Sequence, residues 1–166
     1  MLRSSPNQWF ELPLSLSEGL REKILDIDIE NARNYFIHEP EDNHRLEFLE
    51  IDLDILRELT EQFKVKPTKS TLVAISPTDI VPWHIDGQSH AYHRPAVGCF
   101  PIFPNSKTYE CTEYRDGFVP YCNYVFNTRE EHRAKAGDCR RLNLQLWFAQ
   151  EFEELKKLLD DGKLLI

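Results

Sequence analysis

Residues 140–148 read RRLNLQLWF, an alternation of polar and apolar side chains that is typical of a β-strand. One face of such a strand would carry Arg141, Asn143, Gln145 and Trp147, and the other would carry Leu142, Leu144, Leu146 and Phe148. A strand that packs leucines on one side and points polar side chains to the other suits a barrel with a polar, ligand-holding interior. This stretch therefore predicts a β-barrel around a binding cavity.

The sequence from about Ser70 onward contains further strand candidates. They are STLVAISP, AVGCFPIFP, KTYECTEY and PYCNYVFN, short stretches rich in Val, Ile, Phe, Tyr and Thr that are separated by Pro, Gly, Asn and Asp. The tripeptide RDG at 115–117 reads as a hairpin turn between two of them. Such spacing predicts an all-β sandwich or barrel in this part of the chain.

The two ends of the chain carry helical periodicity. Apolar residues recur at helical spacing in residues 15–25 and 50–63, and a further helix is predicted from about Gln150, with Gly162 as its stop signal. We expect the 166 residues to form a single domain. In it, residues 1–69 would give helical N-terminal support, 70–148 the β-barrel core and 149–166 a C-terminal helix.

Composition and charge narrow the class of protein. Hydrophobic residues make up 41% and charged residues 29%, which is ordinary for a globular protein. The net charge of −8, without a cluster of Lys or Arg, argues against a nucleic-acid partner. No apolar run approaches the roughly 18 residues that span a bilayer, and the N-terminus lacks the apolar core of a signal peptide. We therefore expect a cytoplasmic protein that does not bind membranes.

The four cysteines are Cys99, Cys111, Cys122 and Cys139. They are widely scattered and lack the C-x-x-C pairing of a zinc site. We expect them to be reduced and to serve as small apolar residues of strands, with disulfides or a structural metal as alternatives.

The stretch VPWHIDGQSH at 81–90 carries the candidate metal ligands. On an extended segment His84 and Asp86 point to the same face. Imidazole and carboxylate ligands with open coordination positions favour non-haem Fe(II), provided that a second histidine comes from elsewhere. The structural alternative is a tight bend at Asp86-Gly87 with His84 on the surface.

The second histidine could be any of five: His38, His44, His90, His93 or His132. We favour His132 because it follows a β-rich run and precedes Arg141 by nine residues. A short turn could then bring the two onto neighbouring strands that face one cavity. A dicarboxylate cosubstrate could chelate iron through its 2-oxo acid end while the arginine clamps its distant carboxylate.

These residues resemble a known family. HIDG, followed by NTREEHRAKAGDCRRLNLQLWF, is similar to the H-x-D…H…R pattern of the Fe(II)/2-oxoglutarate-dependent dioxygenases, and most similar to their aspartyl/asparaginyl β-hydroxylase-like branch. The resemblance covers roughly residues 70–148. It implies a double-stranded β-helix, the jelly roll or cupin-like barrel, with flanking N-terminal and C-terminal helices. It also implies Fe(II), 2-oxoglutarate as cosubstrate and O2.

The resemblance assigns roles to individual residues. His84, Asp86 and His132 match the facial triad of metal ligands, and Arg141 matches the basic residue that binds the distant carboxylate of 2-oxoglutarate. Arg94, in HRPAVGCFPIFPN, matches an arginine nearer the substrate or the inner carboxylate of the cosubstrate.

Arg140 is the alternative to Arg141, because a one-residue slip of strand register would exchange the two side chains. Arg141 is preferred because it would share a strand face with Asn143 and Gln145.

The activity that the resemblance implies is hydroxylation of a C–H bond of an amino-acid side chain, free or peptidyl, with release of succinate and CO2. The substrate would be a small molecule or a short peptide. Two other classes of function remain open at this point. One is a cupin-like module that binds a metal or a small acid without oxidising it, and the other is a protein-interaction domain that uses the acidic surface.

Overall fold

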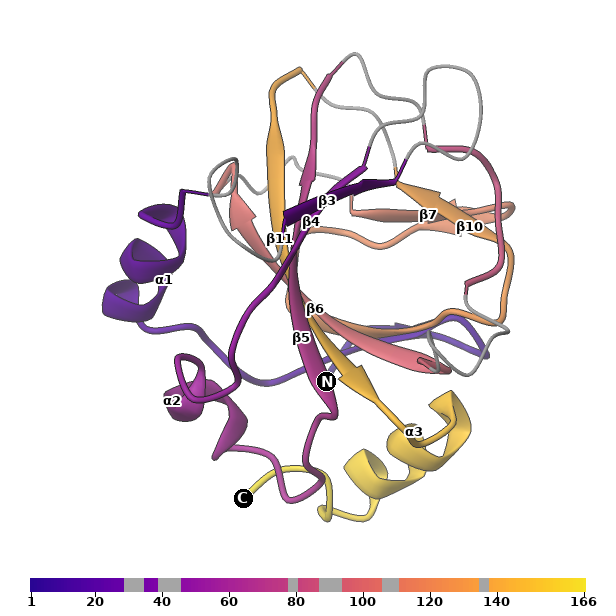
Figure 1. Ribbon diagram of the computed structural model, residues 1–166. Coiled ribbons are helices and arrows are strands. Elements are labelled where there is room, and N and C mark those ends of the chain that lie inside the picture. Colours follow the sequence, from indigo (N-terminus) through magenta and orange to yellow (C-terminus); the bar gives the residue numbers. More distant parts are fainter. Residues whose placement is uncertain (29–34, 39–45, 78–80, 87–93, 106–110, 135–137) are drawn as a thin grey trace.

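The computed structural model describes residues 1–28, 35–38, 46–77, 81–86, 94–105, 111–134 and 138–166 (Figure 1). Its helices are α1 (Glu18–Leu25), α2 (Arg57–Thr60) and α3 (Phe152–Asp160). Its strands are β1 (Ser4–Ser5), β2 (Trp9–Glu11), β3 (Tyr35–His38), β4 (Leu46–Glu50), β5 (Lys69–Ile75), β6 (Ala96–Phe103), β7 (Thr112–Tyr114), β8 (Gly117–Phe118), β9 (Tyr124–Asn127), β10 (His132–Ala134) and β11 (Arg141–Phe148).

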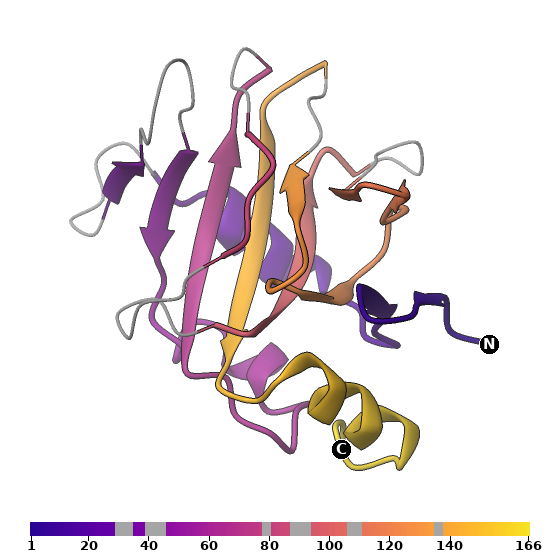
Figure 2. The same cartoon turned by 90° about the vertical axis from the view of Figure 1, so that its right-hand side faces the viewer.

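The strands form two antiparallel sheets. The large sheet has the order β1-β2-β9-β6-β11-β5-β4-β3, and the small sheet has the order β10-β7-β8. In Figure 2 the magenta β5 and the yellow-orange β11 run side by side at the centre of the large sheet, as their antiparallel pairing from Arg141–Ile75 to Trp147–Lys69 requires. The prediction of a mainly β fold with a few helices is confirmed.

The alternation along β11 divides its side chains between two environments, because successive residues of a strand point to opposite faces. Leu144, Leu146 and Phe148 are fully buried in the main hydrophobic core. Arg141, Asn143 and Gln145 line a cavity on the opposite face. The two-faced strand that the sequence predicts is therefore present, with its polar face directed to a cavity.

The main core lies between the large sheet and the helices. Leu20 and Ile24 of α1 and Phe152 and Leu155 of α3 are buried in the same cluster as the leucines of β11. In Figure 1, α1 and α2 lie on one side of β5, β6 and β11, whereas β7 and β10 lie on the other. α1 and α2 thus lie on one face of the large sheet, and its other face meets the small sheet.

Two local signals in the sequence are confirmed. Tyr114 pairs with Gly117 across the β7–β8 hairpin, so Arg115 and Asp116 form a two-residue turn at the predicted RDG position. After α3, Gly162 adopts a positive φ of 68°, a left-handed conformation that glycine tolerates and that ends the helix.

The helix predicted over residues 50–63 is wrong for most of its length. Glu50 ends β4, and α-helix is confined to Arg57–Thr60. The N–H of Leu56 donates to the carbonyl of Leu53, and the N–H of Leu59 donates to the carbonyl of Leu56. These three leucines stand at every third position of the sequence, and each hydrogen bond closes a turn between residues three apart. Successive tight turns therefore produce the same leucine spacing that predicted a helix.

The N-terminal 69 residues are also less helical than expected. They contribute β1, β2, β3 and β4 to the two edges of the large sheet. In the described part of the chain, no helix is both long and apolar enough to cross a membrane.

All four cysteines are free in the structure. The expectation that they are residues of strands holds for Cys99 in β6, whereas Cys111, Cys122 and Cys139 lie outside the strands. Cys99 and Cys111 are buried, and burial raises the pKa of the Cys99 thiol to about 12. Cys99 therefore stays a neutral thiol at physiological pH.

Candidate metal centre

Backbone pairing brings the segment 81–86 alongside β10. The N–H of His84 donates to the carbonyl of His132 and the N–H of His132 donates to the carbonyl of His84, both at 2.9 Å. The N–H of Asp86 donates to the carbonyl of Thr128, also at 2.9 Å. The two imidazole rings therefore lie next to each other, with centroids 4.5 Å apart, while Ile85 points away and is 48% exposed.

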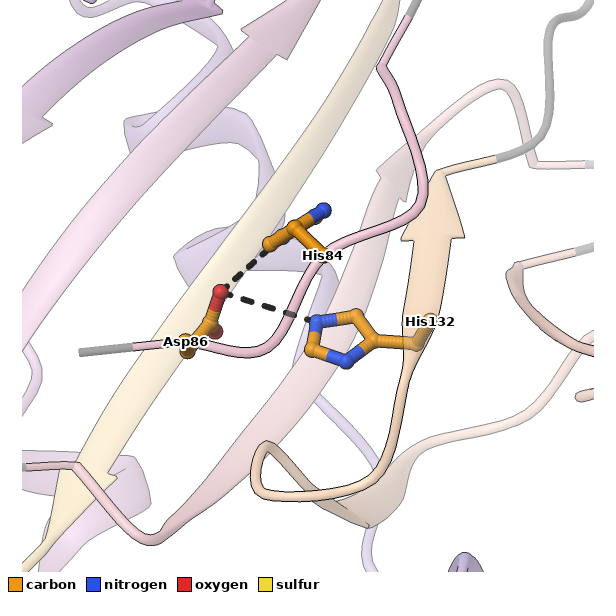
Figure 3. Close-up of side chains that lie close together, drawn as sticks. All are labelled: His84, Asp86 and His132. Carbon is orange, nitrogen blue, oxygen red and sulfur yellow. Dashed lines mark ion pairs between the residues drawn. The ribbon is translucent and has the colours of Figure 1, made fainter. Parts of the chain in front are cut away.

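The three predicted ligands converge on one point (Figure 3). Asp86 Oδ1 lies 2.9 Å from His84 Nε2 and 3.6 Å from His132 Nε2. One ligand atom from each residue lies within 4.8 Å of the others. Asp86 and His132 are buried, whereas the side chain of His84 is 34% exposed.

Both histidines are oriented through their other ring nitrogen. His84 Nδ1 lies 2.7 Å from the carbonyl oxygen of Pro82, and His132 Nδ1 lies 2.7 Å from the carbonyl oxygen of Glu130. A carbonyl oxygen can only accept, so each Nδ1 carries the proton and donates it. In the neutral ring this leaves the lone pair of Nε2 directed at Asp86, which is the tautomer that metal-ligating histidines adopt.

The arrangement fits a divalent cation. Two imidazole lone pairs and a carboxylate oxygen face one another, and three acceptors at this separation repel unless a cation or a proton lies among them. Two histidines and one carboxylate that leave coordination positions open form the ligand set of non-haem Fe(II) sites. His84, Asp86 and His132 therefore meet the requirements of such a site in residue type, spacing and tautomer.

The charges around Asp86 hold it ionised. Burial favours the neutral acid, but the charge of Arg94 and the contacts with the imidazoles of His132 and His84 outweigh it and keep the pKa of the Asp86 carboxyl well below its ordinary value. For His84, burial alone would lower the pKa, whereas the hydrogen bond to Asp86 and its charge raise it above 6.5. Without metal, a proton on His84 offsets the charge of the carboxylate.

This raised pKa predicts a pH dependence of metal binding. His84 must lose its proton to become a ligand, so the affinity for Mn(II) should fall as the pH falls from above the raised His84 pKa to below it. In the apoprotein the sign is opposite. The protonated pair stabilises the fold fully below about pH 6.5, and this contribution is lost as the pH rises through the raised pKa.

Calorimetric titration with Mn(II) across this range, together with the apoprotein Tm, would measure both trends. An Mn(II) affinity that does not change with pH would contradict the assignment of His84 as a ligand.

The cavity beside these residues lies between the two sheets. It holds about 560 Å³ of empty space, including its opening to solvent. Val73 and Ile75 of β5 and Val81 form an apolar cluster at its wall. The polar face of β11 forms another part of the lining, where Arg141 is 2% exposed.

Arg140 is half-buried, precedes β11 and is not among the residues that line the cavity. The structure thus brings Arg141, and not Arg140, to the cavity that contains His84, Asp86 and His132.

One expectation about this arrangement is wrong. His132 and Arg141 do not lie on neighbouring strands, because β10 belongs to the small sheet and β11 to the large sheet. They reach the same cavity from different sheets. The segment 128–132 pairs with 84–86, not with β11, and this explains the placement of His132.

Arg94 contacts Asp86 directly. Its Nη2 forms an ion pair with Asp86 Oδ2 at 3.0 Å, and its Nη1 donates to Gln145 Oε1 at 3.1 Å. Thr128, which the sequence analysis missed, accepts from the N–H of Asp86 and donates its hydroxyl to the carbonyl oxygen of Arg94. A single threonine in a polar run carries no signal for this contact. Among the other candidate histidines, His44, His90, His93 and the side chain of His38 lie outside the described residues.

Comparison with known proteins adds evidence on the fold. No protein-family model and no curated protein matches the sequence. The structure is similar to the crystal structure of a prolyl-4-hydroxylase from Pseudomonas putida, with a TM-score of 0.59 over 86% of this chain and 92% of that chain. The chain shares the fold of this hydroxylase. The two sequences are 16% identical, so the likeness concerns the fold alone.

Proposed function

We propose that the protein is an Fe(II)- and 2-oxoglutarate-dependent oxygenase that hydroxylates a C–H bond of an amino-acid side chain, free or peptidyl. The observation that carries this proposal is the convergence of His84 Nε2, His132 Nε2 and Asp86 Oδ1, with both histidines oriented through Nδ1 by backbone carbonyls. The fold shared with a prolyl-4-hydroxylase, an enzyme of the 2-oxoglutarate oxygenase class, supports it.

In this proposal His84, Asp86 and His132 hold the metal. Bound Fe(II) supplies the O2 chemistry that couples decarboxylation of 2-oxoglutarate, to succinate and CO2, with hydroxylation of the substrate. The chain contributes three fixed ligands that leave other coordination positions open. The carbonyls of Pro82 and Glu130 fix the orientation of the two imidazoles, so little rearrangement is needed when metal binds.

Arg141 is proposed to bind the distant carboxylate of 2-oxoglutarate. Its guanidinium is always charged and presents several N–H donors in a plane that matches a carboxylate. Burial of Arg141 in the cavity lining strengthens such a contact, because little water competes for the charge. The predicted contact of Arg94 with the inner carboxylate or the substrate stays a prediction.

The apolar part of the cavity is proposed to limit water near the reacting groups. Val73, Ile75 and Val81 offer no hydrogen-bonding side chain there. A substrate that fills this space would displace water and bring one C–H bond to a fixed position beside the metal site, which is how a binding site lowers the barrier of a reaction.

The finer features of fold and family are also proposals. The large and small sheets on two sides of a cavity are compatible with a double-stranded β-helix of the jelly-roll type. The assignment to the aspartyl/asparaginyl β-hydroxylase-like branch is supported by the sequence resemblance alone. The single-domain organisation over residues 1–166 is likewise proposed from the length of the chain.

A substrate screen tests the proposed reaction. Iron-loaded protein with 2-oxoglutarate is offered free amino acids and short peptides, including proline-containing peptides because of the fold shared with a prolyl-4-hydroxylase. We expect one class of substrate to raise succinate release and to gain the mass of one oxygen atom. Binding of Fe(II) and 2-oxoglutarate without any succinate release across the screen would favour the non-catalytic cupin-like module.

A further inference from the structure

The guanidinium of Arg94 is held by three side chains around the candidate metal centre. Nη2 pairs with Asp86 Oδ2 at 3.0 Å, and Nη1 donates to Gln145 Oε1 at 3.1 Å. The guanidinium carbon lies 4.7 Å from the ring centroid of Trp147, a cation–π distance. Both terminal nitrogens and one face of the guanidinium therefore contact other side chains of the protein, and the side chain is only 14% exposed.

The side chains that hold Arg94 are themselves anchored in the large sheet. Gln145 and Trp147 lie on the same face of β11, and the indole N–H of Trp147 donates to Thr71 Oγ1 on β5 at 3.2 Å. A guanidinium fixed between an amide and an indole ring has little freedom to rotate. Its position relative to the large sheet is therefore well defined.

The backbones of Asp86 and Arg94 are joined as well. Thr128, which is 1% exposed, accepts a hydrogen bond from the N–H of Asp86 and donates its hydroxyl to the carbonyl oxygen of Arg94. The carboxylate and the guanidinium are thus connected through their side chains and again through Thr128.

The two oxygens of Asp86 consequently face different partners. Oδ1 lies 2.9 Å and 3.6 Å from the Nε2 atoms of His84 and His132, whereas Oδ2 lies 3.0 Å from Arg94. A carboxylate without this constraint could turn about its terminal bond and present either oxygen, or both, to a cation.

We propose that Arg94 is a positioning residue that retains Oδ2 of Asp86, so that the carboxylate offers a single oxygen to a metal bound between the two histidines. This inference rests on the proposed metal role of Asp86. It differs from the expectation that Arg94 contacts the substrate or the inner carboxylate of the cosubstrate. A carboxylate that binds through one oxygen occupies one coordination position, which leaves more positions for other ligands.

The test measures metal affinity in the absence of any 2-oxo acid. Mn(II) is titrated calorimetrically into wild-type protein, Arg94→Met and, as a matched control, Arg3→Met, which removes an arginine–carboxylate pair with Glu11 outside the cavity. Loss of a partner that orients a metal ligand typically weakens metal binding 10- to 100-fold, so we expect about that loss for Arg94→Met and less than about twofold change for Arg3→Met. Unchanged Mn(II) affinity in Arg94→Met would overturn the proposal.

A double variant separates positioning from a general structural role. If Arg94 acts through Asp86, the residual Mn(II) affinity of Asp86→Ala should not fall further when Arg94→Met is added. An additive loss would show that Arg94 acts independently of the carboxylate and would contradict the proposal.

Arg94→Met leaves a buried carboxylate unpaired and could fail to fold. Gln145→Leu then provides the test, because it removes the Nη1 contact but keeps the ion pair. We expect a loss of about two- to tenfold in Mn(II) affinity, below the loss for an ion-pair partner. Wild-type affinity in this variant would count against the proposal. If wild-type protein itself does not bind Mn(II), the proposed metal site fails, which is a distinct outcome.

Discussion

Asp86→Ala is expected to weaken metal binding severely and to abolish the turnover of 2-oxoglutarate. Loss of an outer partner of a metal ligand costs about 10- to 100-fold in affinity, so loss of the ligand itself should cost more than about 100-fold. Asp86 is also the ionised group between the two histidines, and its low pKa keeps it charged across the physiological range. Iron content after anaerobic loading and succinate release would both be measured.

Two further variants support the interpretation of that experiment. Asp86→Asn keeps the size of the side chain but removes its charge, and it should also bind iron poorly. Asp138→Ala removes an exposed aspartate that does not line the cavity, and it should retain wild-type iron content. Unchanged iron content and succinate release in Asp86→Ala would show that the three residues do not form the metal site.

Arg141→Leu is expected to raise the KM for 2-oxoglutarate far more than Arg140→Leu. A charge-assisted hydrogen bond contributes about 1.5–3 kcal/mol, which corresponds to roughly a 10- to 150-fold change in affinity. Arg141 is buried in the cavity lining, whereas Arg140 lies outside it. Initial rates at varied 2-oxoglutarate concentration would give the KM of each variant.

Metal binding provides the control for the Arg141 variant. Fe(II) affinity without cosubstrate should be close to that of wild-type protein, because Arg141 is not one of the three predicted ligands. Equal increases in KM for Arg140→Leu and Arg141→Leu would contradict the assignment of the carboxylate contact to Arg141.

The parts of the fold that the sequence predicted depend on short-range patterns. The alternation in β11 indicated which of its side chains face a cavity, since strand geometry fixes the side of every second residue. The pair His84 and Asp86 was recognisable for the same reason, because the two residues lie two positions apart on an extended segment.

The parts that were missed depend on contacts between distant segments. That β10 pairs with β7, and not with β11, is decided by sheet assembly, which no local spacing in the sequence reveals. The hydrogen bond from the N–H of Asp86 to the carbonyl of Thr128 and the ion pair of Arg94 with Asp86 likewise join separate segments. In residues 50–63, periodicity alone could not distinguish successive three-residue turns from a helix.

The most direct test of the central claim is an anaerobic titration of the apoprotein with Fe(II) and then with 2-oxoglutarate. Chelation of the iron by the 2-oxo acid should produce a weak visible charge-transfer band, and this band should be absent in His132→Ala. If iron binds to the wild-type protein but 2-oxoglutarate produces no band, or if the band persists in His132→Ala, the proposed iron and cosubstrate site is wrong.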